Sequence, residues 1–456
     1  MAYFNRRVDE QLLEWRDAPH HKPLLIRGAR QVGKSSAVRK LGKTFKHYVE
    51  INLEKQASLQ AFFTTDIDVK KTCSKISSAV GIPIIPGKTL LFIDEIQSCL
   101  PAIMSLRYFK EDYPELHVVA AGSLLEFALS EIPSFAVGRI RSLYMYPFSF
   151  DEFLKAQGLD MQLDAIRSAS PQQPLDDVLH QMMIEQVRSF MLVGGMPEAV
   201  SAWVETHDYL ACARVHSDIM ETYLDDFGKY QERMSPELLR KVLRAVALQG
   251  GTKFVYNQAD DEIRSAVVKR ALRKLTQAGL IVPVEHTFAD GLPLGAQVSD
   301  RGVKYLFLDT GLLLSWQSIP STEVLLATDL ELVNKGAMAE IFAGLELMKS
   351  SDCFQRSEMY YWYRHSKNAN AEVDYLEVRK GVILPIEVKA STQGAMQSMY
   401  LFMRTKHLHA AVRTSLENFA SYDHTDPQPA PDDSSPIRHI DVYPLYALGS
   451  MKESWR

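Results

Sequence analysis

The chain has 456 residues, of which 46% are hydrophobic, and its formal net charge is −5 at pH 7. This length exceeds what one hydrophobic core organises, so we expect about three domains. The mild acidic charge excludes a basic chain that coats nucleic acid along its whole length, although a local basic patch is still compatible with it. Four cysteines, none in a Cys-x-x-Cys pair, exclude a zinc ribbon and a disulfide framework.

The N-terminal residues carry acidic side chains and helical apolar spacing over residues 3–19. The sequence contains no apolar run of about 18 residues, the length that spans a membrane. We therefore expect a soluble cytoplasmic protein with no membrane partner.

The apolar run at residues 24–26 leads into a glycine-bounded loop, GARQVGKS at residues 28–35. A strand, this loop and a following helix are the context of a phosphate-binding loop, whereas the alternative is a chance glycine turn. Glycines let backbone N–H groups turn toward the β- and γ-phosphates of ATP, Lys34 adds a positive charge, and Ser35 offers a hydroxyl to Mg²⁺. The residues expected to bind the nucleotide are Gly28, Ala29, Arg30, Gln31, Val32, Gly33, Lys34, Ser35 and Ser36.

Strand-like and helix-like segments then alternate as far as about residue 150. Strands are expected at residues 47–53, 89–97, 116–123 and 143–146, with a helix at 101–113. The continuous apolar run TLLFID is typical of a buried parallel strand. The alternation favours an α/β fold in which helices cover both faces of a parallel sheet and the ligand lies at the carboxyl ends of the strands.

Two carboxylates end the strand expected at residues 89–97. Asp94 is suited to hold Mg²⁺, and Glu95 is suited to orient and deprotonate the attacking water, as in P-loop hydrolases. Ser123, at the end of the next strand, is placed to sense the γ-phosphate or the water, although serine also commonly ends a strand. Arg139 follows a proline-containing loop and is a candidate to stabilise the transferred phosphoryl group, in cis or from a neighbouring subunit. The alternative is a solvated surface arginine.

The middle of the chain changes character twice. Residues 151–232 are helical in pattern and read as a lid. Over residues 233–325, two amphipathic helices are followed by a hairpin-like stretch, an order that resembles a winged helix. Its second helix would present basic residues to a DNA groove, whereas the alternative is a solvated basic face on a packing module. These residues are Lys269, Arg270, Arg273 and Lys274.

The last region, residues 326–456, contains two strand-like runs joined at Lys380-Gly381. Strand alternation places Glu372 and Asp374 on one face of the first run, and Glu387 and Lys389 on one face of the second. One carboxylate from each strand and the adjacent lysine would form a site for a divalent metal, Mg²⁺ or Mn²⁺, that activates water against a phosphodiester. The alternative, a charged alternation on a half-exposed hairpin, accounts poorly for Glu387 and Lys389 in so apolar a run.

These residues resemble a known motif. Asp374 and Glu387-Val388-Lys389, with Glu340 on the preceding helix, resemble the PD-(D/E)xK motif of restriction-endonuclease-like domains, with Val373 in place of the proline. Together with GARQVGKS, LLFIDEIQ, AGS, GRI, GGMPEA and LDTGLL, nearly the whole chain resembles the prokaryotic AAA+ ATPases in which an ATPase domain precedes a C-terminal domain of unknown function. AGS replaces the commoner TGS and keeps Ser123 in place.

The resemblance implies a fold and an assembly. It implies an AAA+ core at residues 1–150 with an arginine finger at Arg139, the lid and winged helix described above, and a C-terminal α/β restriction-endonuclease-like domain. The metal ligands it implies in that domain are Asp374, Glu387 and Glu340. A ring-shaped homo-oligomer is expected, because an arginine finger acts most naturally across a subunit boundary.

Our leading hypothesis is a cytoplasmic AAA+ ATPase that couples Mg-ATP hydrolysis to movement or cleavage of DNA through the nuclease-like domain. The second hypothesis is a nucleotide-dependent switch, in which the C-terminal region grips DNA or a protein partner without cutting it.

Overall fold

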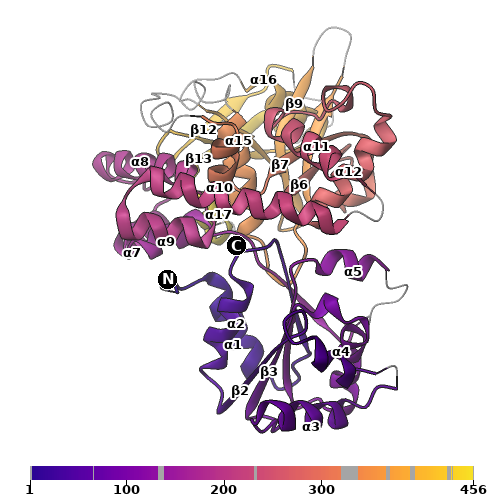
Figure 1. The fold of residues 1–456 in the computed structure, drawn as a ribbon. Coiled ribbons are helices and arrows are strands. Elements are labelled where there is room, and N and C mark those ends of the chain that lie inside the picture. The colour runs from indigo at the N-terminus through magenta and orange to yellow at the C-terminus, as the bar shows by residue number, and fades with distance from the viewer. Residues whose placement is uncertain are drawn as a thin grey trace. The chain divides into compact units, whose positions relative to one another are not determined.

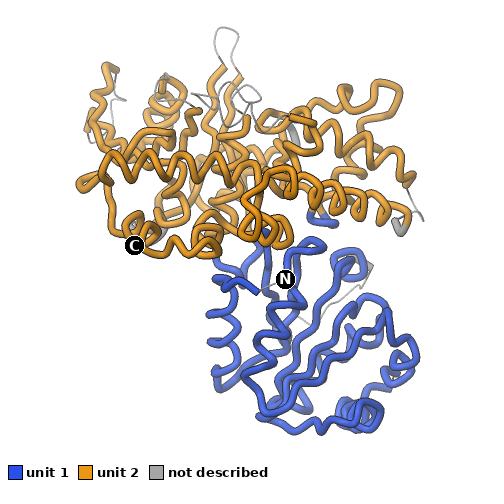
Figure 2. The backbone as a smooth tube through the Cα atoms, turned by 60° about the vertical axis from the view of Figure 1, so that its left-hand side comes forward, with its two compact units in different colours: residues 1–147, 277–279, 352–356 blue, residues 148–276, 280–351, 357–456 orange. Residues whose placement is uncertain are grey.

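The computed structural model describes residues 3–64, 66–131, 138–230, 234–319, 337–365, 370–390, 396–428, 433 and 435–454. Two compact units are present (Figure 2): residues 1–147, 277–279 and 352–356 form unit 1, and residues 148–276, 280–351 and 357–456 form unit 2. The finer division into four domains stays a prediction, and its boundaries at 232/233 and 325/326 lie outside the described residues.

Unit 1 is built on a five-stranded parallel sheet with the order β2-β3-β4-β1-β5 (Figure 1). Its strands are β1 (Leu24–Arg27), β2 (His47–Asn52), β3 (Thr89–Asp94), β4 (His117–Ala121) and β5 (Arg141–Tyr144). Its helices are α1 (Arg7–Asp17), α2 (Lys34–Gly42), α3 (Val69–Val80), α4 (Leu100–Asp112) and α5 (Leu125–Glu131), with short 3₁₀ helices η1 (Ala57–Phe62) and η2 (Ile96–Ser98). The predicted parallel sheet is confirmed.

Helices cover both faces of this sheet, which explains why its central strands are apolar at every position. All residues of β3 and β4 are buried. Leu91 and Ile93 join the core formed with α3 and α4, whereas Leu90 and Phe92 belong to the opposite face, where α2 contacts β3 and β4.

Two histidines are stacked in the interior of unit 1. The rings of His21 and His117 lie 3.8 Å apart at 12°, and Trp15 meets both edge-on. The Nε2 atom of His117 lies 2.9 Å from the carbonyl oxygen of Arg16, and that of His21 lies 3.4 Å from the carbonyl oxygen of Leu116. Burial lowers the pKa of His117 to about 4 and also lowers the pKa of His21, because a protonated ring loses hydration there.

We predict that the stability of unit 1 falls as the pH drops below about 6.5. Folding lowers the pKa of both histidines, so the stabilisation is complete above their ordinary pKa of 6.5 and is lost as protons bind the unfolded chain preferentially. The slope should be at most about one proton per histidine. Urea unfolding at a series of pH values, followed by hydrogen exchange of peptides from β4, measures it.

His117→Phe should reduce this slope, whereas replacement of the exposed His20 by Phe should leave it as in the unmodified protein. An unchanged pH dependence of stability in His117→Phe would show that His117 does not contribute to it.

Unit 2 is organised around an eight-stranded mixed sheet with the order β12-β13-β11-β10-β9-β8-β6-β7. The strands are β6 (Ile281–Thr287), β7 (Val298–Phe307), β8 (Met359–Arg364), β9 (Ala371–Arg379), β10 (Val382–Val388), β11 (Ala410–Ser415), β12 (Ala420–Thr425) and β13 (Ile437–Pro444). The expected hairpin at Lys380-Gly381 is confirmed by the antiparallel pairing of β9 with β10. The hairpin expected as a wing, β6–β7, extends this same sheet because β6 also pairs with β8.

The helices of unit 2 lie before, between and after the strands of this sheet in the sequence, and some of them pack against those strands (Figure 1). They are α6 (Phe150–Ala156), α7 (Asp160–Ser168), α8 (Asp177–Val193), α9 (Pro197–Thr206), α10 (Tyr209–Asp226), α11 (Pro236–Leu248), α12 (Ser265–Gln277), α13 (Thr310–Trp316), α15 (Ala337–Lys349), α16 (Gln397–Thr405) and α17 (Leu448–Ser454). The helical stretch expected between residues 151 and 232 and the two amphipathic helices that follow it are present.

The motifs GGMPEA and LDTGLL meet in unit 2 and have a structural role there. The buried carboxylate of Asp309 accepts hydrogen bonds from the N–H groups of Gly195 (2.6 Å) and Leu312 (3.0 Å). Gly194 has φ +68°, and a Cβ on it would lie 2.1 Å from an Asp309 oxygen. A Cβ on Gly311 would lie 2.8 Å from the backbone of Gly194. Glycine is therefore required on both sides of this contact.

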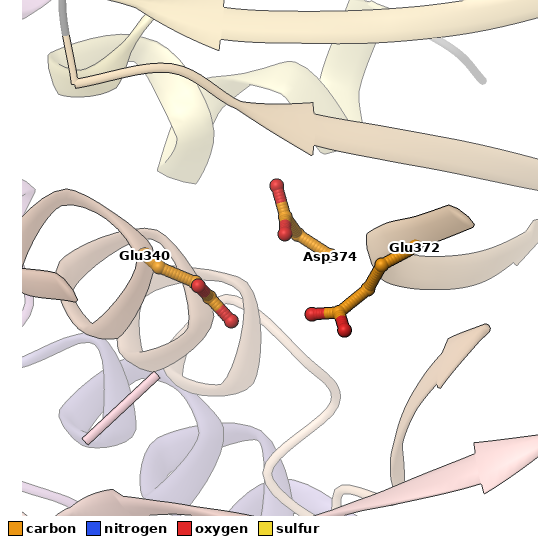
Figure 3. Close-up of side chains that lie close together, drawn as sticks. All are labelled: Glu340, Glu372 and Asp374. Atoms are coloured by element: carbon orange, nitrogen blue, oxygen red, sulfur yellow. The ribbon is translucent and has the colours of Figure 1, made fainter. Parts of the chain in front are cut away.

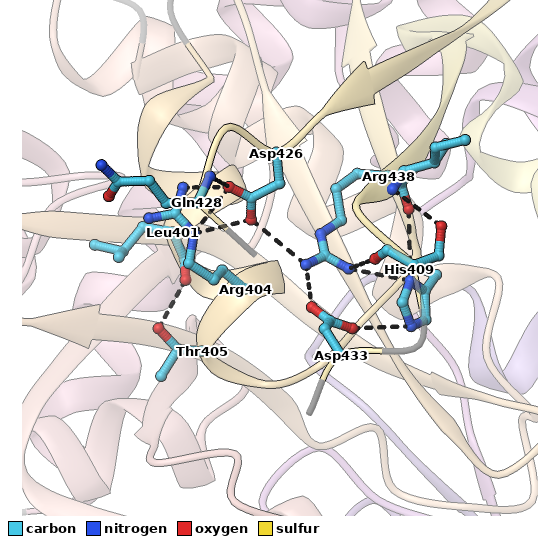
Figure 4. Close-up of polar contacts among 10 residues, drawn as sticks. Leu401, Arg404, Thr405, His409, Asp426, Gln428, Asp433 and Arg438 are labelled. Atoms are coloured by element: carbon cyan, nitrogen blue, oxygen red, sulfur yellow. Dashed lines mark hydrogen bonds and ion pairs between the residues drawn. The ribbon is translucent and has the colours of Figure 1, made fainter. Parts of the chain in front are cut away.

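A buried ion network joins Arg438 of β13 to the carboxylates of Asp426 and Asp433 (Figure 4). Arg438, which is fully buried, pairs with Asp433 and lies 3.4 Å from Asp426. Arg404 forms a second ion pair with Asp426 at 2.5 Å, and its hydrogen bonds lower the pKa of that carboxyl to about 2. His409 lies 3.3 Å from Asp433 on the other side. Each buried charge therefore has a partner, which interior charges require.

Among the described residues, no helix combines the length and the apolar character that crossing a bilayer requires.

Candidate functional site

The loop between β1 and α2 has the backbone geometry of a phosphate-binding loop. Gly28 has φ +142°, and a Cβ on it would lie 2.1 Å from the carbonyl oxygen of Met145. Gly33 has φ +96° and begins α2 as its N-cap, while Gln31 has φ +63°. The two glycines adopt conformations that side-chain-bearing residues rarely adopt, and the N-terminus of α2 opens into the loop.

Lys34 is buried inside this loop. Its ammonium group donates hydrogen bonds to the carbonyl oxygens of Gly28 at 2.9 Å and of Ala29 at 2.6 Å. Burial lowers the pKa of Lys34 to about 8, although the carboxylates of Glu95 and Asp94 oppose this shift. The ammonium group of Lys34 is thus fixed by the loop backbone, near the carboxylates at the end of β3.

Asp94 and Ser35 come together at the carboxyl end of β3. The Ser35 hydroxyl donates to Asp94 Oδ2 at 3.1 Å, the Asn52 amide nitrogen lies 3.5 Å from the same oxygen, and the Glu95 N–H donates to Oδ1 at 3.1 Å. Burial raises the pKa of Asp94, and the charge of Glu95 raises it further. This donor set, a hydroxyl and a carboxylate in contact, is suited to a hard cation such as Mg²⁺.

Glu95 is fixed in one orientation by three hydrogen bonds. Its Oε2 atom accepts from the Ser123 N–H at 3.1 Å, from the Ser123 hydroxyl at 3.0 Å and from the Gln97 amide at 2.6 Å. Its backbone has φ +48°, a left-handed conformation that glutamate rarely adopts. Burial alone would raise the pKa of Glu95, but these hydrogen bonds together with Lys34 lower it. A carboxylate kept ionised beside the loop can accept a proton from water.

Arg139 lies before β5, and its guanidinium is half-exposed. It donates to Glu111 of α4 at 3.1 Å. Arg141, two residues later, lies over the ring of Phe354 at 3.5 Å. The predicted role of Arg139 as an arginine finger stays a prediction.

Asn52 and Gln97 were not singled out from the sequence, yet both contact the carboxylates of this site. Asn52 ends β2, the strand that pairs with β3, so a strand-end rule applied to every strand would have found it. Gln97 lies two residues after Glu95, and a Cβ on the nearby Gly122 would lie 1.9 Å from its Oε1. Its proximity in space follows from the turn after β3, which the sequence does not specify.

Gln97→Ala should lower kcat for ATP hydrolysis by about tenfold and leave KM nearly unchanged, because Gln97 holds Glu95 and not the loop. Steady-state kinetics measures this split, with the exposed Gln172→Ala as the control. An equal loss in both variants, or a rise in KM alone, would show that Gln97 does not orient Glu95.

A second cluster lies in unit 2 (Figure 3). Glu340 on α15 and Glu372 and Asp374 on β9 each place a carboxylate oxygen within 4.8 Å of the others. Helix α15 approaches β9 closely because Gly344 leaves room for Tyr375, whose hydroxyl donates to the carbonyl oxygen of Glu340 at 2.8 Å.

A bulge in β9 sets the position of this cluster. Tyr360 pairs with Leu376 and Trp362 pairs with Val373, so two residues of β9 oppose one residue of β8. Val373 and Leu376, three residues apart, consequently both pack into the core beneath α16. Strict alternation would place these two residues on opposite faces of the sheet. The bulge therefore changes the direction of Asp374, which lies between them.

Lys304 of β7 reaches the same cluster. Its ammonium group lies 2.7 Å from Glu340 and also contacts Glu372, and its side chain is fully buried. Burial raises the pKa of Glu340, although Lys304 opposes this shift. Glu372 was expected only as a neighbour of Asp374, and Lys304 was not expected at all.

Glu387 lies on β10, Lys389 directly follows that strand, and the two side chains form an ion pair at 2.7 Å. Asp374 accepts a hydrogen bond from the N–H of Val388 at 2.8 Å, which joins the two strands at this point. Burial raises the pKa of Glu387, and the charge of Asp374 raises it further. The structure therefore brings Asp374, Glu387 and Lys389 to one place, while it gives Glu340 a lysine partner. Carboxylates in this arrangement are suited to bind one hard cation.

The chain matches three families in separate segments. Residues 20–154 match a family described as an AAA domain, and residues 184–323 and 335–435 match two domains of unknown function. The chain therefore carries an AAA-type P-loop ATPase domain, and the C-terminal segments belong to domain families without an assigned function. No curated protein matches the sequence significantly.

Matches among solved structures have low sequence identities and low TM-scores. A Walker-type ATPase of Pyrococcus abyssi is 17% identical with a TM-score of 0.44, and the match covers 69% of this chain and 96% of that chain. The Orc1 protein of Aeropyrum pernix in complex with DNA is 12% identical with a TM-score of 0.28, covering 70% and 92%. Unliganded Pif1 from a Bacteroides species is 12% identical with a TM-score of 0.21, covering 42% and 57%.

Proposed function

We propose that this protein is an AAA-type ATPase that hydrolyses Mg-ATP at the loop of residues 28–36. The observation that carries the proposal is the contact between Ser35 and Asp94 beside a glutamate held by Ser123. Serine and aspartate would hold Mg²⁺, which when bound neutralises phosphate charge and orients the terminal phosphate. The residues that would hold the metal and the residue that would act as the base thus lie together at the carboxyl end of β3.

The chain's own residues have separate tasks in this proposal. Lys34 exchanges its carbonyl partners for phosphate oxygens, a change that its flexible stem allows. Glu95 accepts the proton of the attacking water, and Ser123 holds that carboxylate while remaining near the γ-phosphate. Arg139, half-exposed and paired with Glu111, acts across a subunit boundary in a ring-shaped homo-oligomer.

Two variants separate binding from hydrolysis. Lys34→Ala should lose ATP affinity, whereas Glu95→Gln should keep it and lose about 100-fold or more in kcat. Nucleotide binding by fluorescence titration and phosphate release by a coupled assay measure the two properties. The exposed residues Lys43 and Glu54 provide matched controls, Lys43→Ala and Glu54→Gln. Undiminished turnover in both site variants would overturn the assignment.

For the C-terminal region, we propose DNA as the substrate and metal-dependent phosphodiester cleavage as the reaction. The observation that favours it is that Asp374 on β9 lies beside the end of β10, where Glu387 pairs with Lys389. A buried oxygen of Glu387 has no hydrogen-bond partner among the described residues. These residues fit one divalent cation, which when bound activates water. Helix α12, with basic residues on its surface, would contact the DNA backbone, and the protein would act in the cytoplasm.

The proposed cleavage of DNA is tested with two double variants. Supercoiled plasmid and linear DNA incubated with Mg²⁺ or Mn²⁺ should be nicked by the protein, and Glu387→Ala/Lys389→Ala should remove the nicking. The matched control is Glu377→Ala/Arg379→Ala, which removes a different acid–base pair from the same hairpin.

The alternative function, a nucleotide-dependent switch that holds DNA or a protein without cutting, has its own signature. DNA binding with a steep salt dependence and no cleavage of any substrate favours this switch.

A further inference from the structure

An ammonium group lies inside the carboxylate cluster of unit 2. Lys304 contacts Glu372 and lies 2.7 Å from Glu340, and none of its side chain is exposed. Both contacts are ion pairs between the ammonium group and a carboxylate. The cluster therefore contains a cationic group that belongs to the chain itself.

The position of this ammonium group is fixed by a third side chain. It lies 4.8 Å from the centre of the Tyr361 ring, and the Tyr361 hydroxyl donates to the carbonyl oxygen of Gly302 at 2.7 Å. A cation over an aromatic face in the interior is stabilised by the ring. Lys304 is consequently held between two carboxylates and a ring, and its burial keeps it from touching a DNA phosphate.

The net charge of the cluster would be balanced by one additional divalent cation. Glu340, Glu372 and Asp374 form one group of carboxylates, and Glu387 lies near enough to Asp374 for their charges to interact. Lys304 pairs with Glu340 and Glu372, and Lys389 pairs with Glu387. If all are ionised, four negative and two positive charges leave two negative charges, which a single divalent ion would balance. The buried Oε2 atom of Glu387 has no hydrogen-bond partner among the described residues. A cation bound beside Asp374 and Glu387 would supply a partner for this oxygen.

We propose that Lys304 occupies the cation position between Glu340 and Glu372, so that unit 2 binds one divalent ion, at Asp374 and Glu387, instead of two. The second half of this inference rests on the metal-dependent function proposed above. Lys304 is then a positioning residue, because it neutralises Glu340 and Glu372 and holds α15 against the sheet without touching the substrate.

The test is a comparison of thermal unfolding and Mn²⁺ binding without nucleotide or DNA. An Asp94→Asn background keeps unit 1 from contributing a metal site. Lys304→Met should lower the unfolding temperature of unit 2 in EDTA by about 5 °C or more, because it leaves the partly buried carboxylates of Glu340 and Glu372 without a counter-charge. Excess Mn²⁺ should restore most of this loss, and calorimetric titration should show one additional bound ion per chain.

The control is Lys253→Met, an exposed lysine whose backbone pairs with that of Lys304. Equal stability of Lys304→Met and Lys253→Met in EDTA would overturn the proposal, as would equal stabilisation by Mn²⁺ of the protein with and without Lys304.

A second variant guards against failure to fold. Lys304→Met/Glu372→Gln removes one charge of each sign, so it should be more stable in EDTA than Lys304→Met alone. It should also bind Mn²⁺ more tightly than Glu372→Gln, and the opposite order would contradict the proposal. Absence of DNA cleavage in every protein, with these metal effects present, would reject the nuclease function and leave the role of Lys304 standing.

Discussion

Both candidate sites depend on a buried lysine among carboxylates. A charged side chain loses its hydration in the interior and is tolerated only where opposite charges or hydrogen-bond partners replace the water. Lys34 meets this requirement through the loop carbonyl oxygens and the nearby Asp94 and Glu95, whereas Lys304 meets it through Glu340 and Glu372. The two lysines differ in how easily their ammonium groups change partners. Lys34 can exchange its carbonyl partners for phosphate oxygens, whereas Lys304 is held in place by two carboxylates and an aromatic ring.

Departures from regular backbone geometry position the carboxylates in each unit. In unit 1, Glu95 directly follows β3 and itself has a left-handed backbone, and Ser123, beyond the end of β4, donates a hydrogen bond to its carboxylate. In unit 2, the bulge in β9 breaks the alternation beside Asp374. Such conformations cost free energy and persist because surrounding contacts determine them, which is common at functional sites. The glycines at positions 28 and 33 meet the same need in the phosphate loop without the strain of a Cβ.

The predictable part of the fold follows from rules that act over short stretches of chain. The parallel sheet of unit 1 was predictable because its strands are apolar without interruption and alternate with helices. The ends of parallel strands share one edge, so Asp94, Glu95 and Ser123 were predictable as neighbours of the phosphate loop. The same rule applied to β2 would have found Asn52, whereas Gln97 was not predictable, since hydrogen-bond partners at a turn depend on side-chain directions. The motifs around Gly194 and Asp309 were visible in the sequence, but their packing role required seeing the two backbones in contact.

The sequence by itself determined the phosphate loop, the strand that carries Asp94 and Glu95, and the hairpin that carries Asp374 and Glu387, because each depends on residues close together in the chain. Tertiary structure decided the partners of the carboxylates in unit 2. Lys304 belongs to a hairpin expected as a wing, and it reaches Glu340 and Glu372 only because β6 pairs with β8 and joins both regions in one sheet. Charge pairing over such a separation depends on strand order and register, which local periodicity does not encode.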